Sequence, residues 1–142
     1  MNRGAKQYAS VSKHSGVESA TPHQLIAMLF EGSIMRLNTA RGCMERKDFA
    51  CKGEHLGRAI TIISGLQGFL DLEKGGDLAR NLDALYDYIS RILLEASIRN
   101  DVNKVDEAIS LIKTIKEGWD GISEQVNGQQ AMHQPVAEGA YR

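Results

Sequence analysis

The sequence predicts an all-helical protein, an antiparallel up-down four-helix bundle with a short N-terminal helical segment and a mobile C-terminal tail. The chain of 142 residues contains only two prolines, Pro22 and Pro135, so the long interval between them is free of the residue that breaks helices most strongly. Strand signals are missing: no β-branched residues alternate with polar ones, and Asn127-Gly128 stands beside a Gln-rich tail rather than between strands. The length suits one domain with a single core.

Helix-start and helix-stop signals divide the chain into its elements. The expected order is an N-terminal segment over 1–20, a bundle over 21–125 with helices at 22–45, 49–73, 78–99 and 102–124, and a disordered tail over 126–142. The expected N-caps are Thr21, Asp48, Asp77 and Asp101. Pro22 suits the first helical position and Gln24 completes a capping box with Thr21. Gly75-Gly76 ends the second helix.

Apolar residues in these helices recur at spacings of four and three, which is typical of a bundle seam. The second helix offers Phe49, Leu56, Ile60, Ile63 and Leu70. The third offers Leu78, Leu82, Leu85, Ile89, Ile92 and Ala96, and the fourth Val105, Ala108, Ile112, Ile115, Trp119 and Ile122. Because the connections are short, neighbouring helices are expected to run antiparallel.

Charge and hydropathy exclude two classes of partner. Lys plus Arg number 17 against 18 acidic residues, without the basic excess of a nucleic-acid-binding protein. No apolar run is long enough for membrane insertion. The N-terminal sequence MNRGAKQYASVSKHS lacks an apolar signal core, so we expect a cytoplasmic protein, either a monomer or a weak homodimer.

Side chains with the spacing of a reactive site are missing. We expect Cys43 and Cys51 to be free, buried thiols rather than a disulfide. Cys51 and His55, four residues apart, could supply half a metal site, but no second pair completes it, and no Glu-x-x-His or glycine-rich phosphate loop occurs. We therefore expect no catalytic residues, no metal and no cofactor, and we do not expect an enzyme.

The first helix is apolar over more than one sector. Leu25, Met28, Leu29, Gly32, Met35 and Cys43 are expected to face the core, and Ile26, Phe30, Ile34, Leu37 and Met44 to form a second face. Two interpretations of the second face stay open. It is covered by Tyr8 and Val11 of the N-terminal segment, or it is a groove for a partner's apolar helix, and both hold if the partner displaces the segment.

The second helix carries small residues on one side. Gly53, Gly57, Thr61, Ser64 and Gly68 form a strip beside its core face. Each interior glycine costs about 1 kcal/mol relative to alanine, and small residues let another backbone approach closely. The strip either packs against a helix of the same bundle or receives an external chain. Leu94 and Ile98 lie roughly opposite the seam of the third helix.

Several motifs in order resemble the flagellar secretion chaperones of the FliS family. They are the N-terminal Tyr8, VESATPHQLI at 17–26, MLFEG at 28–32, RKD at 46–48, KGE at 52–54, LEKGGD at 72–77, NLDALYDY at 81–88, Asn100-Asp101 and Trp119-Asp120. The similarity runs from Tyr8 to about Ile122. Phe30-Glu31 departs from the usual Tyr-Asp, so a hydroxyl is lost and an acid is lengthened.

The resemblance implies a cytoplasmic chaperone that binds the disordered C-terminal region of flagellin and prevents premature polymerisation before type III export. Other flagellar export or regulatory proteins are further partners that it allows. The alternative is a generic helical adaptor or secretion chaperone for another client. The expected client-binding residues are Tyr8, Val11, Ile26, Phe30, Ile34, Leu37, Gly53, Gly57, Ser64, Gly68, Tyr86 and Tyr88.

Overall fold

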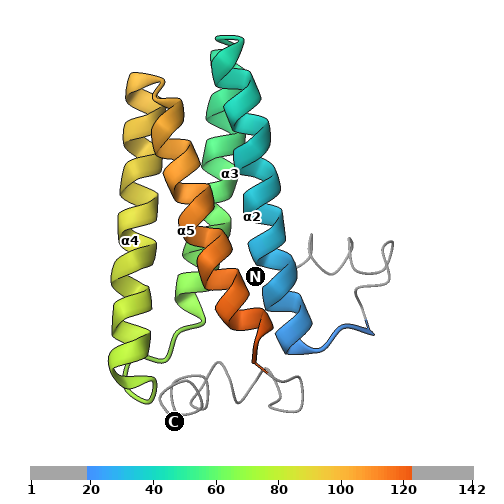
Figure 1. The fold of residues 1–142 in the computed structure, drawn as a ribbon, viewed down its shortest axis with the longest axis vertical. Helices are drawn as coiled ribbons and strands as arrows, with labels where there is room; N and C mark the ends of the chain where they lie inside the picture. Colours follow the sequence, from blue (N-terminus) through green and yellow to red (C-terminus); the bar gives the residue numbers. More distant parts are fainter. Residues whose placement is uncertain (1–18, 123–142) are drawn as a thin grey trace.

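Four antiparallel helices make up the part of the chain that the computed structural model describes, residues 19–122 (Figure 1). They are α2 (Pro22–Glu45), α3 (Phe49–Gly68), α4 (Gly76–Arg99) and α5 (Val102–Asp120), and no strand occurs among these residues. The predicted four-helix bundle is confirmed. The expected C-terminal tail over 126–142 lies outside the described residues, and so does the expected N-terminal segment over 1–20 except for residues 19–20.

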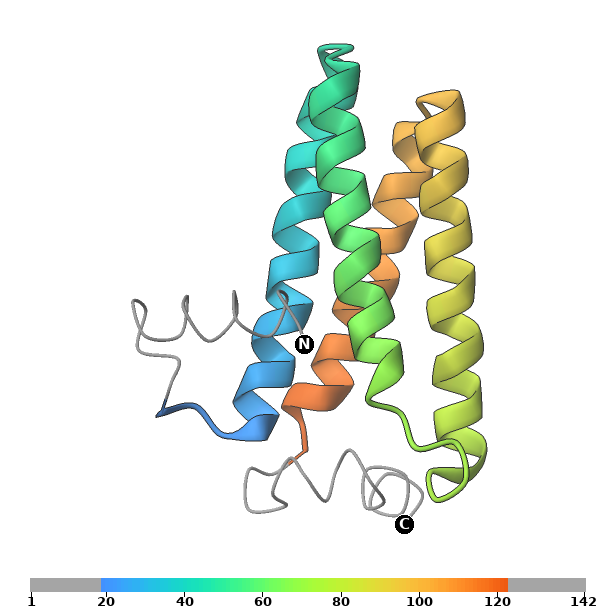
Figure 2. The same cartoon turned by 180° about the vertical axis from the view of Figure 1, so that it is seen from behind.

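The helices pack in a ring, so that each contacts mainly two others. α2 packs against α3 and α5, and α4 packs against the same two helices. The α2–α3 and α4–α5 turns lie at one end of the bundle, and the α3–α4 connection lies at the other with the start of α2 and the end of α5 (Figures 1 and 2). Each helix therefore keeps one side that its neighbours leave uncovered.

Three of the four predicted N-caps are confirmed. The Thr21 hydroxyl accepts a hydrogen bond from the Gln24 backbone N–H at 3.1 Å, and the Gln24 side chain accepts one from the Thr21 N–H at 2.9 Å. The carboxylates of Asp48 and Asp101 accept hydrogen bonds from backbone N–H groups in the first turns of α3 and α5. These contacts satisfy donors that a helix leaves unpaired at its start.

The ends of two helices were predicted wrongly. α3 ends at Gly68 instead of near Glu73, and α5 ends at Asp120 instead of near Glu124. After α3 the Phe69 backbone N–H donates to the Leu66 and Gln67 carbonyl oxygens, and in the connection that follows the Asp71 side chain accepts a hydrogen bond from the Lys74 backbone N–H at 3.0 Å. Such side-chain bonds to the backbone compete with helix formation.

The predicted cap of α4 was also wrong. The N-cap is Gly75, which has no side chain to accept a hydrogen bond, and Asp77 lies within the first turn. A side chain at Gly75 would collide with Ala79 and come within 2.6 Å of the Asp71 carbonyl oxygen, while Gly76 has a φ of 61°. This sharp connection therefore requires both glycines.

The core side of α2 is the adjoining sector rather than the predicted one, although Cys43 of the predicted set is buried. The buried residues of α2 are His23, Ile26, Phe30, Ser33, Leu37, Ala40, Cys43 and Met44. The expected core residues Leu25, Met28 and Met35 are 40%, 42% and 61% exposed. The expected surface residues Ile26, Phe30, Leu37 and Met44 lie in the core.

A spacing signal for the correct side was present in the sequence. Residues 23, 26, 30, 33, 37, 40 and 44, which we call the α2 seam, alternate by three and four along the helix. Three of them, His23, Ser33 and Ala40, are not large apolar residues. Ser33 is buried because its hydroxyl donates to the Phe30 carbonyl oxygen at 2.8 Å, and Ala40 adds little apolar surface. A comparison of large apolar side chains alone therefore misses the seam.

Phe49 also lies elsewhere than predicted, since its side chain is 57% exposed rather than in the core. Lys52 takes its place as the first buried residue of α3. The Lys52 ammonium donates to the Ser97 carbonyl oxygen at 2.8 Å and lies 4.7 Å from the centre of the Phe49 ring. A cation is favourable there because the carbonyl groups at the end of α4 carry partial negative charge.

A paired contact closes the opposite end of the bundle. The rings of His23 and Trp119 stack with their centres 4.7 Å apart. The Trp119 indole N–H donates to the His23 carbonyl oxygen at 2.9 Å, and the His23 Nε2–H donates to the Trp119 carbonyl oxygen at the same distance. The start of α2 is thereby fixed to the end of α5.

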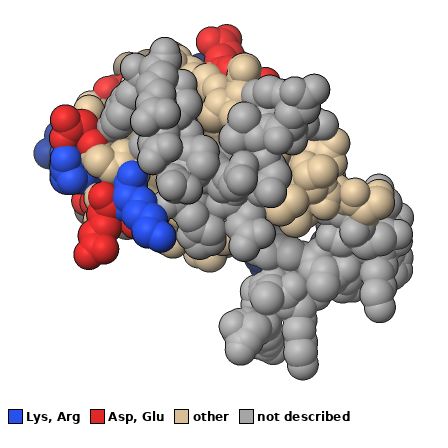
Figure 3. Space-filling model, turned by 90° about the horizontal axis from the view of Figure 1, so that it is seen from below, with Lys and Arg blue, Asp and Glu red and all other residues tan. Residues whose placement is uncertain are grey.

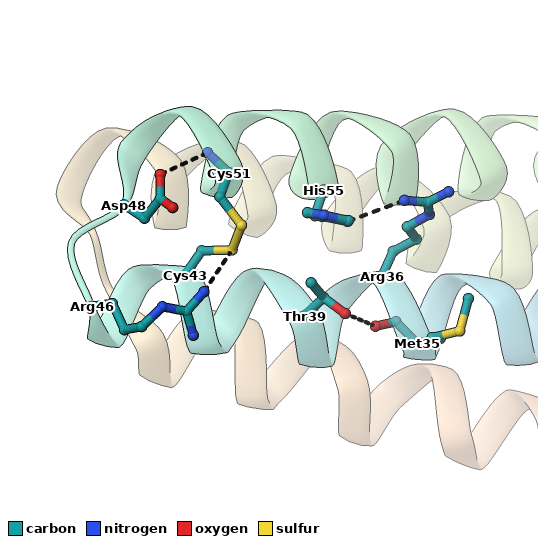
Figure 4. Close-up of a disulfide and its surroundings, with 8 residues drawn as sticks. All are labelled: Met35, Arg36, Thr39, Cys43, Arg46, Asp48, Cys51 and His55. Atoms are coloured by element: carbon teal, nitrogen blue, oxygen red, sulfur yellow. Dashed lines mark hydrogen bonds between the residues drawn. A yellow bond between two sulfur atoms is a disulfide. The ribbon is translucent and has the colours of Figure 1, made fainter.

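The expectation that both cysteines are free is wrong in this structure, because Cys43 and Cys51 form a disulfide between α2 and α3 (Figure 4). Their Cα atoms lie 5.7 Å apart, within the usual range for a disulfide. The short turn over 46–48 folds α3 back along α2 and brings the two residues together. Counting cysteines misses this, since it takes no account of the antiparallel turn.

The first prediction tests which side of α2 is buried. Replacing Leu37, which is fully buried, by alanine should lower the free energy of unfolding by about 2–5 kcal/mol because it leaves a cavity. Met35→Ala on the exposed side should change it by less than about 0.5 kcal/mol. Urea unfolding followed by circular dichroism measures both. Equal losses in the two variants would contradict the observed packing.

The second prediction concerns pH and the ion pair between α2 and α5. The Arg41 guanidinium donates to both carboxylate oxygens of Asp106, at 2.6 and 3.1 Å, and the hydrogen bonding lowers the pKa of Asp106 below its ordinary value of 3.8. Since the folded pKa is the lower one, the pair stabilises the fold above about pH 4 and this contribution is lost as the pH falls through the folded pKa.

Asp106→Asn should therefore lower the melting temperature by roughly 2–4 °C at pH 6, and the difference from the parent chain should shrink at lower pH. Glu54→Gln, which removes an exposed pair with Arg58 within α3, is the matched control and should have a smaller effect. A melting difference for Asp106→Asn that does not vary with pH would contradict this role.

Candidate client-binding surface

The small-residue strip of α3 (Gly53, Gly57, Thr61, Ser64 and Gly68) lies on the outside of the bundle. All five residues are exposed. A Cβ atom added at Gly53, Gly57 or Gly68 would meet no atom within 4 Å. Of the two interpretations left open by the sequence, packing against another helix of the same bundle is therefore wrong for the described residues. The strip is a surface over which another chain can come close to the α3 backbone.

Leu94 and Ile98 of α4 border the same surface. They are 56% and 83% exposed. Asp87 lies at the junction of α3 and α4, since its carboxylate accepts a hydrogen bond from the Gln67 side chain at 2.9 Å. Leu94 follows Asp87 by about two helical turns, and Ile98 follows it by about three. Residues separated by whole turns share one side of a helix. The strip and the Leu94–Ile98 pair therefore flank the α3–α4 junction, and we call them together the outer α3–α4 face.

A second surface is a groove between α2 and α5 with a volume of about 580 Å³. Ile34 and Met35 line it from α2, and Lys113 and Lys116 line it from α5, with Glu31 and Asp120 among its other lining residues. Lys116 pairs with Asp120 at 2.5 Å, and the hydrogen bond with that carboxylate raises the pKa of Lys116. The groove thus combines an apolar wall with a rim on which charges of both signs are paired.

The structure separates the residues predicted to bind a client. Gly53, Gly57, Ser64 and Gly68 are exposed together on α3, and Ile34 lines the α2–α5 groove. Ile26, Phe30 and Leu37 are buried in the core, so the expectation that they belong to a second, surface-facing side of α2 is wrong, and Tyr86 is buried in the core as well. Tyr8 and Val11 lie outside the described residues. The predicted set is therefore not one surface.

The two tyrosines of α4 have structural surroundings. Tyr86 is 3% exposed, and its burial raises the pKa of the phenol. Tyr88 is half-buried, and its hydroxyl donates to the Glu107 carboxylate of α5 at 2.5 Å. That hydrogen bond raises the pKa of Tyr88 because the neighbouring carboxylate disfavours a phenolate. Both side chains join α4 to the rest of the bundle.

Charged groups are unevenly spread at the lower end of the bundle. Seen from that end, side chains of both signs gather on the side of α4, whereas the described surface on the side of α2 shows mostly uncharged atoms (Figure 3). Leu25 and Met28 belong to the first turns of α2 and are exposed. The apolar outer side of α2 therefore begins at this end and leads to Met35 in the α2–α5 groove.

The residues that could supply half a metal site are engaged otherwise. The Cys51 sulfur is bonded to Cys43, and His55 Nδ1 accepts a hydrogen bond from Arg36 at 3.1 Å (Figure 4). Across residues 19–122, no three histidine, cysteine or acidic side chains come together as a metal site would require. Over the same range, no helix combines the length and hydropathy needed to cross a membrane.

The family model described as flagellar protein FliS matches residues 4–126 of the chain. The chain belongs to the FliS family. It is 48% identical over 121 residues to the flagellar secretion chaperone FliSB of Pseudomonas aeruginosa, which covers 85% of this chain and 96% of that protein. It is also 48% identical over 129 residues to the flagellar secretion chaperone FliS of Salmonella typhimurium, which covers 90% of this chain and 96% of that protein.

More distant FliS proteins match as well. The flagellar secretion chaperone FliS of Bacillus subtilis is 30% identical over 107 residues, which covers 75% of this chain and 79% of that protein. The resemblance found in the sequence motifs is thus confirmed. FliS proteins are flagellar chaperones and not enzymes.

Proposed function

We propose that this chain is a cytoplasmic export chaperone that binds the disordered C-terminal region of flagellin, prevents its premature polymerisation and supports its delivery to the flagellar type III export apparatus. The observation that carries the proposal is the exposed small-residue strip of α3 on a chain of the FliS family. The proposed site is the outer α3–α4 face, with the α2–α5 groove as a second contact.

The glycines of the strip lower the stability of α3. Gly53 and Gly57, which lie within α3, each destabilise it by about 1 kcal/mol relative to alanine. No described residue fills the space beside them. A client helix that lies along the strip would use that space, because the missing side chains let the two backbones approach closely. This explains why small residues stand here.

The apolar borders supply the free energy for binding. A segment that is disordered when free loses conformational entropy as it becomes ordered, and burial of apolar surface must offset this loss. Leu94 and Ile98 flank the strip, and Ile34 and Met35 line the groove on α2. Each large side chain that the client covers contributes on the order of 1–3 kcal/mol.

Tyr8 and Val11 remain in the proposed client site, and the family resemblance includes Tyr8. Their expected resting place is changed, because Phe30 and Leu37 are buried in the core and Ile34 alone of that group lines a surface groove. The side of α2 that Tyr8 and Val11 were expected to cover is therefore not one continuous surface. A generic helical adaptor with another client is the alternative function, and the experiment below separates the two.

The third prediction tests the outer α3–α4 face with a peptide of the flagellin C-terminal region. Titration calorimetry should show binding with a negative heat-capacity change, and circular dichroism should show a gain of helix. Gly57→Leu should weaken binding at least tenfold, because the new side chain holds the client helix away. Its melting temperature should hold or rise, since leucine is the better helix former and its Cβ enters open space.

Gly118→Leu on α5 is the matched control. Gly118 is also an exposed helical glycine whose added Cβ would meet nothing within 4 Å, but it does not belong to the strip. This variant should bind the peptide as the parent chain does. Unchanged binding by Gly57→Leu would exclude the strip as the client site. If the parent chain itself bound no flagellin peptide, the flagellin proposal would be wrong and the generic adaptor would stand.

A further inference from the structure

Two cysteines lie at the end of the bundle that carries the α2–α3 turn, and the proposed chaperone function does not use them. Cys43 belongs to the last turns of α2 and is fully buried, whereas Cys51 belongs to the first turn of α3 and is half-buried. Of the two residues, only Cys51 is therefore partly exposed to solvent. The bundle places the Cα atoms of the two cysteines 5.7 Å apart, so a disulfide can form between their sulfur atoms without refolding of the chain.

The charges around the pair differ between the two cysteines. The Arg46 guanidinium lies 3.8 Å from the Cys43 sulfur and favours a thiolate there (Figure 4). At Cys51 two effects oppose each other. The start of α3 favours a negative sulfur, while the Asp48 carboxylate, which accepts the Cys51 backbone N–H at 3.2 Å, disfavours it. The greater exposure of Cys51 therefore favours it as the cysteine that reacts first with a molecule from solution. The Arg46 guanidinium favours Cys43 as the thiolate that then forms the protein disulfide.

We propose that Cys43 and Cys51 are a reversible redox-modification site that exchanges with low-molecular-weight disulfides such as oxidised glutathione. The Cys51 thiolate attacks the small disulfide, forms a mixed disulfide and releases one small thiol. The Cys43 thiolate then attacks the Cys51 sulfur, the protein disulfide forms, and the second small thiol leaves. Two protein thiols are oxidised and one small disulfide is reduced to two thiols.

The modification acts on the hairpin that α2 and α3 form. A disulfide closes the chain between residues eight positions apart and thereby restricts the unfolded state. In the cytoplasm, the compartment proposed above, excess reduced thiol opens such bonds. The disulfides that do occur there are usually transient or redox-sensing. The pair thus gives the bundle two covalent states with the same fold and different stability.

The fourth prediction uses the purified full chain in mixtures of reduced and oxidised glutathione. After alkylation, mass spectrometry should show two modified thiols under reducing conditions and none under oxidising ones, with the change reversed by reduced glutathione. The oxidised chain should melt on the order of 10 °C higher than the reduced chain. A disulfide that never forms, that links two chains, or that resists reduced glutathione would overturn the proposal.

Variants test the separate roles of the two sulfurs. Cys43→Ser should accumulate one glutathione on Cys51, whereas Cys51→Ser, which keeps only the buried sulfur, should accumulate at least tenfold less. Arg46→Gln should slow ring closure by roughly threefold to tenfold, and Lys47→Gln, the matched loss of a neighbouring exposed cation, should not. Equal glutathione uptake by the two serine variants, or equal ring closure in the Arg46 and Lys47 variants, would contradict the assigned roles. Circular dichroism confirms that each variant is folded.

Discussion

The structure depends on the choice of the side of α2 that is buried. α2 is apolar over more than half of its circumference, but a bundle covers only one stripe of it well. The α2 seam is the side that is buried, because it forms a continuous line of contact from His23 to Met44. Its small residues also let the neighbouring helices come close. Leu25, Met28 and Met35 are consequently left outside. The position of the apolar surface is thus a result of core packing.

The two ends of the bundle are held by polar contacts that differ in kind. At the end where the described chain begins, the stacked His23 and Trp119 rings exchange hydrogen bonds between α2 and α5. At the other end, Lys52 joins α3 to the last carbonyl groups of α4, and the disulfide joins α2 to α3. These contacts use the inner sides of the helices and leave the outer side of α3, with its glycines, free within the described bundle.

The number of helices, the antiparallel order and three of the caps could be predicted, because proline spacing, capping residues and the three-four alternation are local signals. The buried side of α2 could not be chosen by counting large apolar residues, since Ser33 and Ala40 complete the seam. α3 ends at Gly68 in a turn in which the Phe69 backbone N–H donates to the Leu66 and Gln67 carbonyl oxygens, and the disulfide depends on the antiparallel hairpin. Helical spacing predicts the small-residue strip, but its exposure depends on how the neighbouring helices are arranged.

The central claim is that the outer α3–α4 face receives the client while the α2 seam stays internal. Amide NMR spectra of the chain with increasing amounts of flagellin C-terminal peptide test it most directly, because glycine amides are well separated in such spectra. The account predicts the largest changes at Gly53, Gly57 and Gly68 and at Leu94 and Ile98, with little change at Gly118. Changes confined to the α2–α5 groove, with the glycine signals of α3 unmoved, would contradict it.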